Sequence, residues 1–247
     1  MKEIRLIEIE LFSYCNRTCV FCPNSYIDRL SENKILDVKA FERLIQDLKS
    51  ISYSKYISLS RYCEPLAHRD ILDERISYIR KHLPLVTIVA NTNGDYYYDG
   101  VDIDELTVMD YDIKMKKEDL GLLKRATKPY LVRKMRLGKL NNRAGALELK
   151  KKYIRDFPCY EPSYFIGVDY NGSVAPCCNM RSDVELHKEF ILGNIKKSSI
   201  LDIWGSPKAE KFRKDTREAK FSSVCLTCSK GPGRYTVEHP NIMNKTT

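Results

Sequence analysis

Three cysteines near the N-terminus have a spacing that suits an iron–sulfur cluster. Cys15, Cys19 and Cys22 follow an apolar strand pattern, with three residues between the first two and two between the last two. A single loop with this spacing can place thiolates at three corners of a four-iron cube, and thiolates are the soft ligands that such clusters require. Zinc sites usually show Cys-x-x-Cys twice over. The triplet therefore predicts a four-iron cluster whose fourth iron is left free to chelate a small molecule.

A second group of cysteines lies in the C-terminal third of the chain. Cys159, Cys177, Cys225 and Cys228 surround segments typical of a β-hairpin and a helix, which can present four thiolates to one cluster. Their spacing is less regular than that of a zinc ribbon, but spacing alone leaves zinc open as an alternative. The chain has nine cysteines, and in a reducing compartment this number favours metal binding over disulfides.

The segments around the first triplet alternate between strand and helix patterns. This β-α-β-α-β order predicts a parallel sheet with right-handed crossovers, and we expect a partial (β/α) barrel of five or six parallel strands. The expected strands are residues 4–12, 56–60, 85–90, 105–113 and 130–135, and the expected helices are residues 37–51, 71–82 and 120–126.

The C-terminal part reads differently. Residues 164–176 alternate around Asn171-Gly172, a strong hairpin turn signal, and residues 208–219 read as a helix. We therefore expect two domains, a partial barrel over residues 1–155 and a small hairpin-plus-helix domain over residues 156–247.

In a parallel barrel the reactive residues collect at the C-terminal ends of the strands. The cysteine loop, the run 61–65 and the run 91–95 all follow expected strands.

Composition narrows the class of protein. The 247 residues are 43% hydrophobic, which excludes a disordered chain, and no apolar run approaches the roughly 20 residues of a membrane span. The N-terminus is charged and passes straight into a strand pattern, so we expect a cytoplasmic protein. The net charge of +9 is concentrated in residues 114–155. That segment could dock an acidic electron donor or hold a phosphorylated or nucleic substrate, but solvated helix faces are the interpretation that we favour.

Several motifs in their order along the chain resemble the radical SAM enzymes with a SPASM or shortened "twitch" extension. The compact size and the single auxiliary set of four cysteines resemble most the aminocyclitol dehydrogenases of this family, which oxidise a ring hydroxyl to a ketone. The motifs are the first triplet, residues 62–65, 92–94, 142–145, 171–177 and 193–195, Ile203-Trp204 and the closing Cys-x-x-Cys.

The resemblance implies roles for individual residues. Cys15, Cys19 and Cys22 would bind the four-iron cluster that cleaves S-adenosyl-L-methionine (SAM), with Phe21 against the adenine and Glu64 on the SAM amino group. Asn91, Asn93 and Arg143 would be candidates for the methionine carboxylate or the ribose. A second four-iron cluster, fully ligated and acting as an electron relay, would be held by Cys159, Cys177, Cys225 and Cys228.

Two positions depart from the family pattern. Cys63 stands where the family usually has glycine, and Cys178 with Asn179 does not match the aminocyclitol dehydrogenases. The substrate therefore need not be shared. In a dehydrogenase, Arg143 or Tyr62 could position the reacting hydroxyl. In an epimerase, Cys178 or Cys63 could return a hydrogen atom, although free cysteines are more often packing residues.

The expected partners follow from this resemblance. The substrate would be a polar small molecule, anionic or sugar-like, and a flavodoxin- or ferredoxin-type protein would supply electrons. Modification of a ribosomal peptide is an alternative, which the lack of room for a leader-binding domain makes weaker. A zinc-stabilised nucleic-acid module using residues 114–155 is another alternative, but we do not expect a nucleic-acid or membrane partner.

Overall fold

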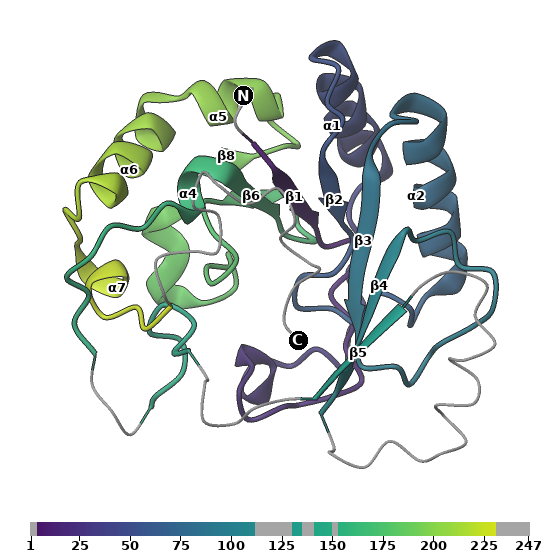
Figure 1. The fold of residues 1–247 in the computed structure, drawn as a ribbon, viewed down its shortest axis with the longest axis horizontal. Coiled ribbons are helices and arrows are strands. Elements are labelled where there is room, and N and C mark those ends of the chain that lie inside the picture. The colour runs from purple at the N-terminus through teal and green to yellow at the C-terminus, as the bar shows by residue number, and fades with distance from the viewer. Residues whose placement is uncertain (1–3, 112–129, 135–140, 150–152, 231–247) are drawn as a thin grey trace.

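The protein forms one curved, mostly parallel sheet with helices around it (Figure 1). In this computed structural model, the described residues are 4–111, 130–134, 141–149 and 153–230. Within them the strand order is β5-β4-β3-β2-β1-β6-β7-β8, where β1 to β6 are parallel and β7 and β8 are antiparallel. The strands are β1 (Leu6–Ile9), β2 (Tyr56–Ser58), β3 (Thr87–Thr92), β4 (Glu105–Asp110), β5 (Tyr130–Lys134), β6 (Phe165–Val168), β7 (Ser173–Ala175) and β8 (Gly193–Asn194).

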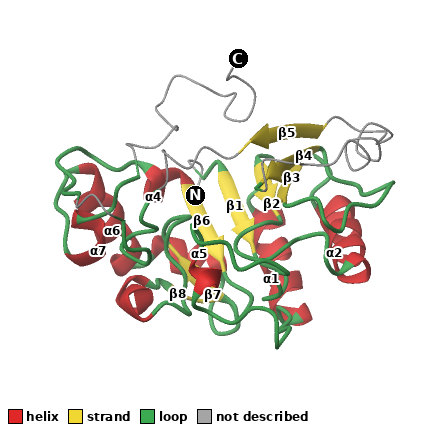
Figure 2. Ribbon diagram, turned by 90° about the horizontal axis from the view of Figure 1, so that it is seen from below, coloured by secondary structure: helices red, strands yellow, loops and turns green. Residues whose placement is uncertain are grey.

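The predicted open arrangement of five or six parallel strands is confirmed, since six strands run parallel. Helices α1 (Val38–Ser50) and α2 (Arg69–His82) connect β1, β2 and β3 and lie on one side of the sheet (Figure 2). Asp37 caps α1 by accepting a hydrogen bond from the amide of Ala40 at 2.9 Å. The apolar face of α1 then packs into the main core beneath the sheet. None of the helices in the described ranges is long and apolar enough to cross a membrane.

The C-terminal elements complete the sheet rather than standing apart from it. The predicted hairpin is present as β6 and β7, but β6 also pairs in parallel with β1 and is the sixth parallel strand. The sheet therefore runs across the boundary expected at residue 155. The helices of this part are α4 (Glu161–Tyr164), α5 (Ile200–Gly205), α6 (Pro207–Arg217) and α7 (Ser223–Leu226), with a short 3-10 segment at Glu185–Phe190. Another 3-10 segment, Pro23–Ser25, lies near the N-terminus between β1 and α1.

The strand and helix ends differ from the predicted ones by a few residues. Strand β3 continues to Thr92, so Asn91 belongs to the strand and does not follow it. The helix expected at 208–219 is α6. The helix expected at 120–126 and most of the basic segment 114–155 lie outside the described residues.

The connection from β3 to β4 contains three tyrosines in place of a crossover helix. Tyr98 donates to Asp73 of α2 at 2.6 Å, and the hydroxyls of Tyr96 and Tyr14 lie 3.1 Å apart. All three tyrosines pack against the main core. The tyrosine run therefore covers the helix side of the sheet, which a crossover helix would otherwise cover.

Candidate active site

The first cysteine triplet lies on a loop that is closed at its base. Phe12 and Ile35 form an isolated antiparallel bridge, and the amide of Ser13 donates to the carbonyl of Lys34 at 2.8 Å. Inside the loop, the amide of Cys15 donates to the carbonyl of Arg29 at 3.1 Å. These contacts hold the ends of a long loop together, so that its cysteines extend from the C-terminal end of β1.

Side chains at the end of β3 hold the same loop from the other side. Arg17 forms a two-pronged ion pair with Asp95, with Nε–Oδ2 at 2.7 Å and Nη2–Oδ1 at 2.6 Å. Asn16 donates to Asp95 at 2.7 Å and accepts from Asn93 at 2.9 Å. Planar guanidinium–carboxylate pairing fixes direction as well as distance. The loop is therefore oriented by the strand end that carries the predicted Asn91 and Asn93.

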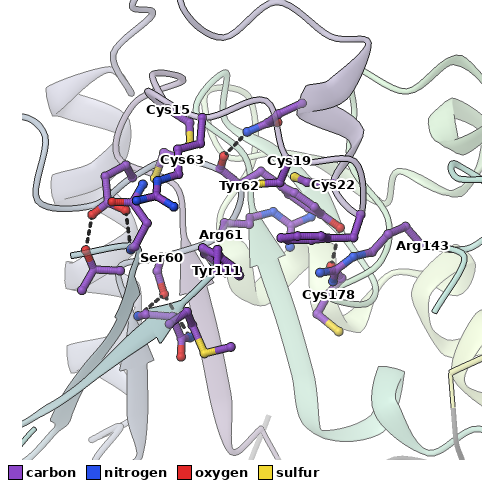
Figure 3. A pocket seen from close by; sticks show the side chains of 18 of the residues that line it. Cys15, Cys19, Cys22, Ser60, Arg61, Tyr62, Cys63, Tyr111, Arg143 and Cys178 are labelled. Atoms are coloured by element: carbon purple, nitrogen blue, oxygen red, sulfur yellow. Dashed lines mark hydrogen bonds between the residues drawn. The ribbon is translucent and has the colours of Figure 1, made fainter. Parts of the chain in front are cut away.

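The predicted residues of the first site meet in one cavity of about 320 Å³ at the C-terminal ends of β1 to β4 (Figure 3). The close view shows Cys15, Cys19 and Cys22 on one wall and Cys178 and Arg143 across from them. The residues named from the sequence that line it are Cys15, Cys19, Phe21, Cys22, Tyr62, Cys63, Glu64, Asn91, Asn93, Arg143 and Cys178. The structure thus brings together every residue predicted for the first site, including Arg143 and Cys178 from distant parts of the chain.

Glu64 is a buried carboxylate held by donors from β3 and its own turn. It is 2% exposed and accepts from Thr92 Oγ1 at 2.5 Å, from the amide of Asn93 at 2.8 Å and from the amide of Leu66 at 3.2 Å. Burial raises the pKa of Glu64 to about 7, against the lowering effect of these hydrogen bonds. A carboxylate with a raised pKa in a cavity favours a cationic ligand group, which would stabilise its charged form.

Tyr62, Arg143 and Cys178 form the opposite wall. The Tyr62 hydroxyl donates to the carbonyl of Cys178 at 2.8 Å, and the Arg143 guanidinium lies 5.8 Å from the centre of the Tyr62 ring. Burial raises the pKa of the Tyr62 hydroxyl, which therefore stays protonated. Arg143 and Ala144 have positive φ angles of 49° and 51°, so the loop that carries Arg143 turns sharply toward the cavity.

The floor of the cavity contains charged residues that the sequence analysis did not assign. Arg61 donates to Asp169 at 2.5 Å, to Glu8 at 3.3 Å and to the carbonyl of Met180. Its guanidinium lies over Gly167, where an added Cβ would be 2.3 Å from Nη1. Burial raises the pKa of Glu8 to about 7. Barrel interiors are usually filled by branched apolar side chains, so a charged floor indicates a binding site for a polar molecule.

One sequence signal could have identified part of this floor. Glu8 in β1 and Glu10 just after it alternate with apolar residues, and strands of a parallel sheet are usually buried on both faces, where charged residues rarely lie without a partner. Tyr111 was also missed. Its ring lies 5.1 Å from that of Phe21 with an interplanar angle of 35°, and both rings line the cavity.

The four C-terminal cysteines line a second, smaller cavity of about 20 Å³. Cys225 is carried by α7, Cys177 follows β7, and the amide of Cys159 donates to the carbonyl of Thr216 in α6 at 2.9 Å. A buried apolar cluster that includes Met180 packs against three of these cysteines. Within the described ranges, no three His, Cys, Asp or Glu side chains come close enough to share one metal ion.

The two cavities share a wall. Cys177 lines the second cavity and the next residue, Cys178, lines the first. The Lys230 ammonium, which also lines the second cavity, is 2.7 Å from Cys178 Sγ and 2.8 Å from Glu161 Oε1. Consecutive residues of the chain therefore border the two cavities.

The C-terminal part also positions a residue of the first cavity. Asn142 donates to the carbonyl of Thr227 at 2.7 Å and accepts from the amide of Ser229 at 3.1 Å. His187 Nε2 lies 3.0 Å from the carbonyl of Ala144. These contacts flank Arg143, so the Cys225–Cys228 turn and the guanidinium of the first cavity are held in one arrangement.

Both sites fit the groups that the resemblance implies. In the first, three thiols from one loop and one buried carboxylate with a raised pKa suit a cluster with an open iron and an ammonium-bearing ligand. In the second, four thiols lie with the buried Arg155 Nη1, a donor that makes no hydrogen bond within the described residues, and with two N–H donors to Cys228 Sγ, Asn179 Nδ2 and Arg155 Nη2. Such donors suit a negatively charged group bound through thiolates.

The chain is similar to known proteins over most of its length. Residues 159–229 match SPASM, an iron–sulfur cluster-binding domain. The chain is 27% identical over 241 residues to the S-adenosyl-L-methionine-dependent 2-deoxy-scyllo-inosamine dehydrogenase of Niallia circulans, covering 92% of this chain and 94% of that protein. A solved structure of BtrN in complex with AdoMet and 2-DOIA matches with a TM-score of 0.76 and 26% identity, over 94% of this chain and 97% of that one.

More distant structures share the fold. Native anSMEcpe with bound AdoMet matches with a TM-score of 0.60 at 13% identity, over 90% of this chain and 88% of that one. The likeness to BtrN extends over nearly the whole chain, and the SPASM match covers the segment that carries the second cysteine group. The chain therefore has a SPASM-like iron–sulfur cluster-binding segment, and it is similar over nearly its whole length to a SAM-dependent dehydrogenase, as the sequence resemblance predicts.

Proposed function

We propose that this protein is an oxidoreductase that binds SAM and two four-iron clusters and oxidises a hydroxyl of a polar small molecule to a ketone. The observation that carries the proposal is the wall between the two cavities, where consecutive residues Cys177 and Cys178 face the second and the first cavity. A dehydrogenase has to remove an electron from its substrate, and this wall offers a short path for that electron from the first cavity to the second. The similarity to an aminocyclitol dehydrogenase supports the same reaction class.

In this proposal the two parts of the chain have different roles. Residues 1–155, completed by strand β6, form the SAM-binding barrel, where Cys15, Cys19 and Cys22 hold the first cluster, and the rest of residues 156–247 forms the auxiliary region. When bound, SAM and this cluster supply a 5′-deoxyadenosyl radical that removes a hydrogen atom from a substrate C–H bond. Glu64 pairs with the SAM ammonium, and the ring of Phe21 lies against the adenine. Asn91 and Asn93 are placed to contact the rest of the nucleoside or the methionine carboxylate.

The residues of the opposite wall orient the substrate. The Tyr62 hydroxyl donates its hydrogen bond to the Cys178 carbonyl, so its oxygen is free to accept a hydrogen bond from the substrate hydroxyl. The Arg143 cation beside it favours loss of the hydroxyl proton to solvent water, because a nearby positive charge stabilises the resulting alkoxide. The Arg61–Glu8 floor would contact the remaining hydroxyls or an amine. This polar lining supports a sugar-like or aminocyclitol-like substrate.

The auxiliary region takes part through its four thiolates. Cys159, Cys177, Cys225 and Cys228 would ligate every corner of the second cluster, which in this role accepts one electron from the substrate. Full ligation leaves no iron open to the substrate, so the second cluster acts only as a relay. A flavodoxin- or ferredoxin-type protein would reduce the first cluster.

An anaerobic reaction with SAM, a chemical reductant and a panel of polyols and aminocyclitols in heavy water tests the proposal. A product two mass units lighter than its substrate, formed together with 5′-deoxyadenosine, is expected. An isomer of the substrate that carries one solvent deuterium would contradict dehydrogenation and point to epimerisation. In that case the Cys178→Ala and Cys63→Ala variants would identify the hydrogen donor, since both thiols line the first cavity.

A further inference from the structure

One sulfur of the auxiliary site receives two hydrogen bonds from buried side chains. Asn179 Nδ2 lies 3.8 Å from Cys228 Sγ, and Arg155 Nη2 lies 3.9 Å from the same atom. Both distances suit N–H donors to sulfur. Asn179 is 1% exposed and Arg155 is 3% exposed, and both line the second cavity. The Cys228 corner of the cavity is therefore more polar than its surroundings.

The same two side chains have polar atoms without a partner. Among the described residues, Asn179 Oδ1 and Arg155 Nη1 are buried and make no hydrogen bond, and neither does Glu161 Oε2 of the same cavity, whose other oxygen pairs with Lys230. Leaving such atoms unpaired usually costs about 1–3 kcal/mol each, more for a charged group, so native proteins rarely bury them without a reason. The rest of the lining is largely apolar, including Met180, Phe212 and Phe221. An unpaired guanidinium nitrogen in such a cavity indicates that an anionic group belongs there.

Positive charge in this cavity would stabilise the reduced form of an electron-accepting group. A cluster gains one negative charge when it is reduced, so a nearby cation and N–H donors on its sulfurs stabilise the reduced form more than the oxidised form. Burial strengthens this effect because the surrounding dielectric is low. The positive charge of Lys230 is already shared with Glu161. Arg155 has no carboxylate among its contacts in the described chain, which are the Cys228 sulfur, the Lys230 carbonyl and the rings of Phe157 and Phe221.

We propose that Asn179 and Arg155 are positioning residues that raise the reduction potential of the auxiliary cluster through the sulfur of Cys228. This inference rests on the proposed function, in which that cluster takes the substrate electron. Asn179 directly follows Cys178 in the wall between the cavities, so one of the two donors lies on the side from which the electron would reach the cluster. A higher potential makes the cluster a better acceptor without any change in its ligands.

The test is a redox titration of the full-length protein with both clusters, followed by electron paramagnetic resonance under anaerobic conditions. Asn179→Leu and Arg155→Gln should each lower the equilibrium constant for reducing the auxiliary cluster about tenfold, which is about 59 mV for one electron. The potential of the first cluster should not move. Arg217→Gln is the matched control, because this arginine also lies in the auxiliary region but contacts Ser163 and not a cysteine.

The results below distinguish failure of this inference from failure of the proposed function. Wild-type protein with about four irons per chain instead of about eight would remove the auxiliary cluster and with it the proposed function. About eight irons with unchanged potentials in both variants would leave the function standing and overturn this inference. If Asn179→Leu does not retain its iron, Asn179→Ser and Arg155→Lys replace the two variants. Asn179→Ser should then show the lower potential, and Arg155→Lys, which keeps the charge, should retain part of the wild-type potential. Unchanged potential in Asn179→Ser would contradict the inference.

Discussion

The two cysteine sites are assembled in different ways. The first takes three cysteines from one loop of eight residues, and its supports are polar contacts at strand ends, such as the Arg17–Asp95 pair. The second takes its cysteines from three separate segments, and packing against the apolar cluster around Met180 supports it. The first site can thus form from local loop geometry and an adjacent strand. The second exists only when the whole C-terminal part has folded.

This difference predicts that the two sites can be lost separately. Cys19→Ala should reduce SAM cleavage to background and remove about four irons per chain, because only two thiolates would remain for the first cluster. Cys177→Ala should also lose about four irons, yet it should still cleave SAM to 5′-deoxyadenosine while forming no ketone. Iron analysis and product quantification check both variants.

The control is Cys63→Ala, since this thiol lines the first cavity but belongs to neither predicted ligand set. It should keep about eight irons and SAM cleavage. If Cys177→Ala abolished SAM cleavage as completely as Cys19→Ala does, the first site would depend on the second. The shared contacts of Asn142 with the Cys225–Cys228 turn would then be its most direct explanation.

The second prediction concerns a substitution that affects the first site alone. Glu64→Gln removes the carboxylate that pairs with the SAM ammonium in the proposed function, and breaking a buried charge pair costs about 2–5 kcal/mol, so SAM affinity should fall at least about 30-fold. The auxiliary cluster should be unaffected. Isothermal titration with SAM measures the affinity, and Glu32→Gln, whose side chain is 72% exposed, is the control.

The pH dependence of SAM binding sharpens this prediction. The Glu64 pKa of about 7 means that the empty site is partly protonated near neutral pH. The SAM ammonium prefers the charged carboxylate, so wild-type affinity should decline as the pH falls below about 7 and level off above it. Glu64→Gln should show no such decline. A pH-independent affinity of the wild type would show that the ammonium binds elsewhere.

The same contrast explains what the sequence could and could not predict. The first site was predictable because Cys15, Cys19 and Cys22 are local and Glu64 and Asn93 follow strands with clear periodicity. The second ligand set came from the family resemblance, since spacing alone left zinc open. That β6 would join the main sheet was not predicted, because the hairpin signal at Asn171-Gly172 reports only on local pairing. The Arg61 floor depends on Gly167, which is 106 residues away and adjacent only through the sheet.

The smallest expected effect concerns the part of the sheet where the two regions meet. Strand β6 of the C-terminal part borders β1, and the Arg61 guanidinium lies on Gly167 of β6 while it contacts Glu8 of β1. In Gly167→Ala the new methyl group would lie 2.3 Å from Arg61 Nη1, and the guanidinium cannot yield freely because Asp169 and the Met180 carbonyl hold it. Overpacking of this kind destabilises a protein by about 1–3 kcal/mol.

The matched control is Gly205→Ala at the end of α5, where an added Cβ meets no atom within 4 Å. This change should be neutral or stabilise by about 0.4–1 kcal/mol, because it only restricts the unfolded chain. Chemical denaturation of both variants with their clusters in place gives the difference. If Gly167→Ala were as stable as Gly205→Ala, Arg61 would be free to leave the floor. The floor could then not be a fixed binding surface for substrate, and the two sites would be connected through the wall between them and the Asn142 contacts alone among the connections described above.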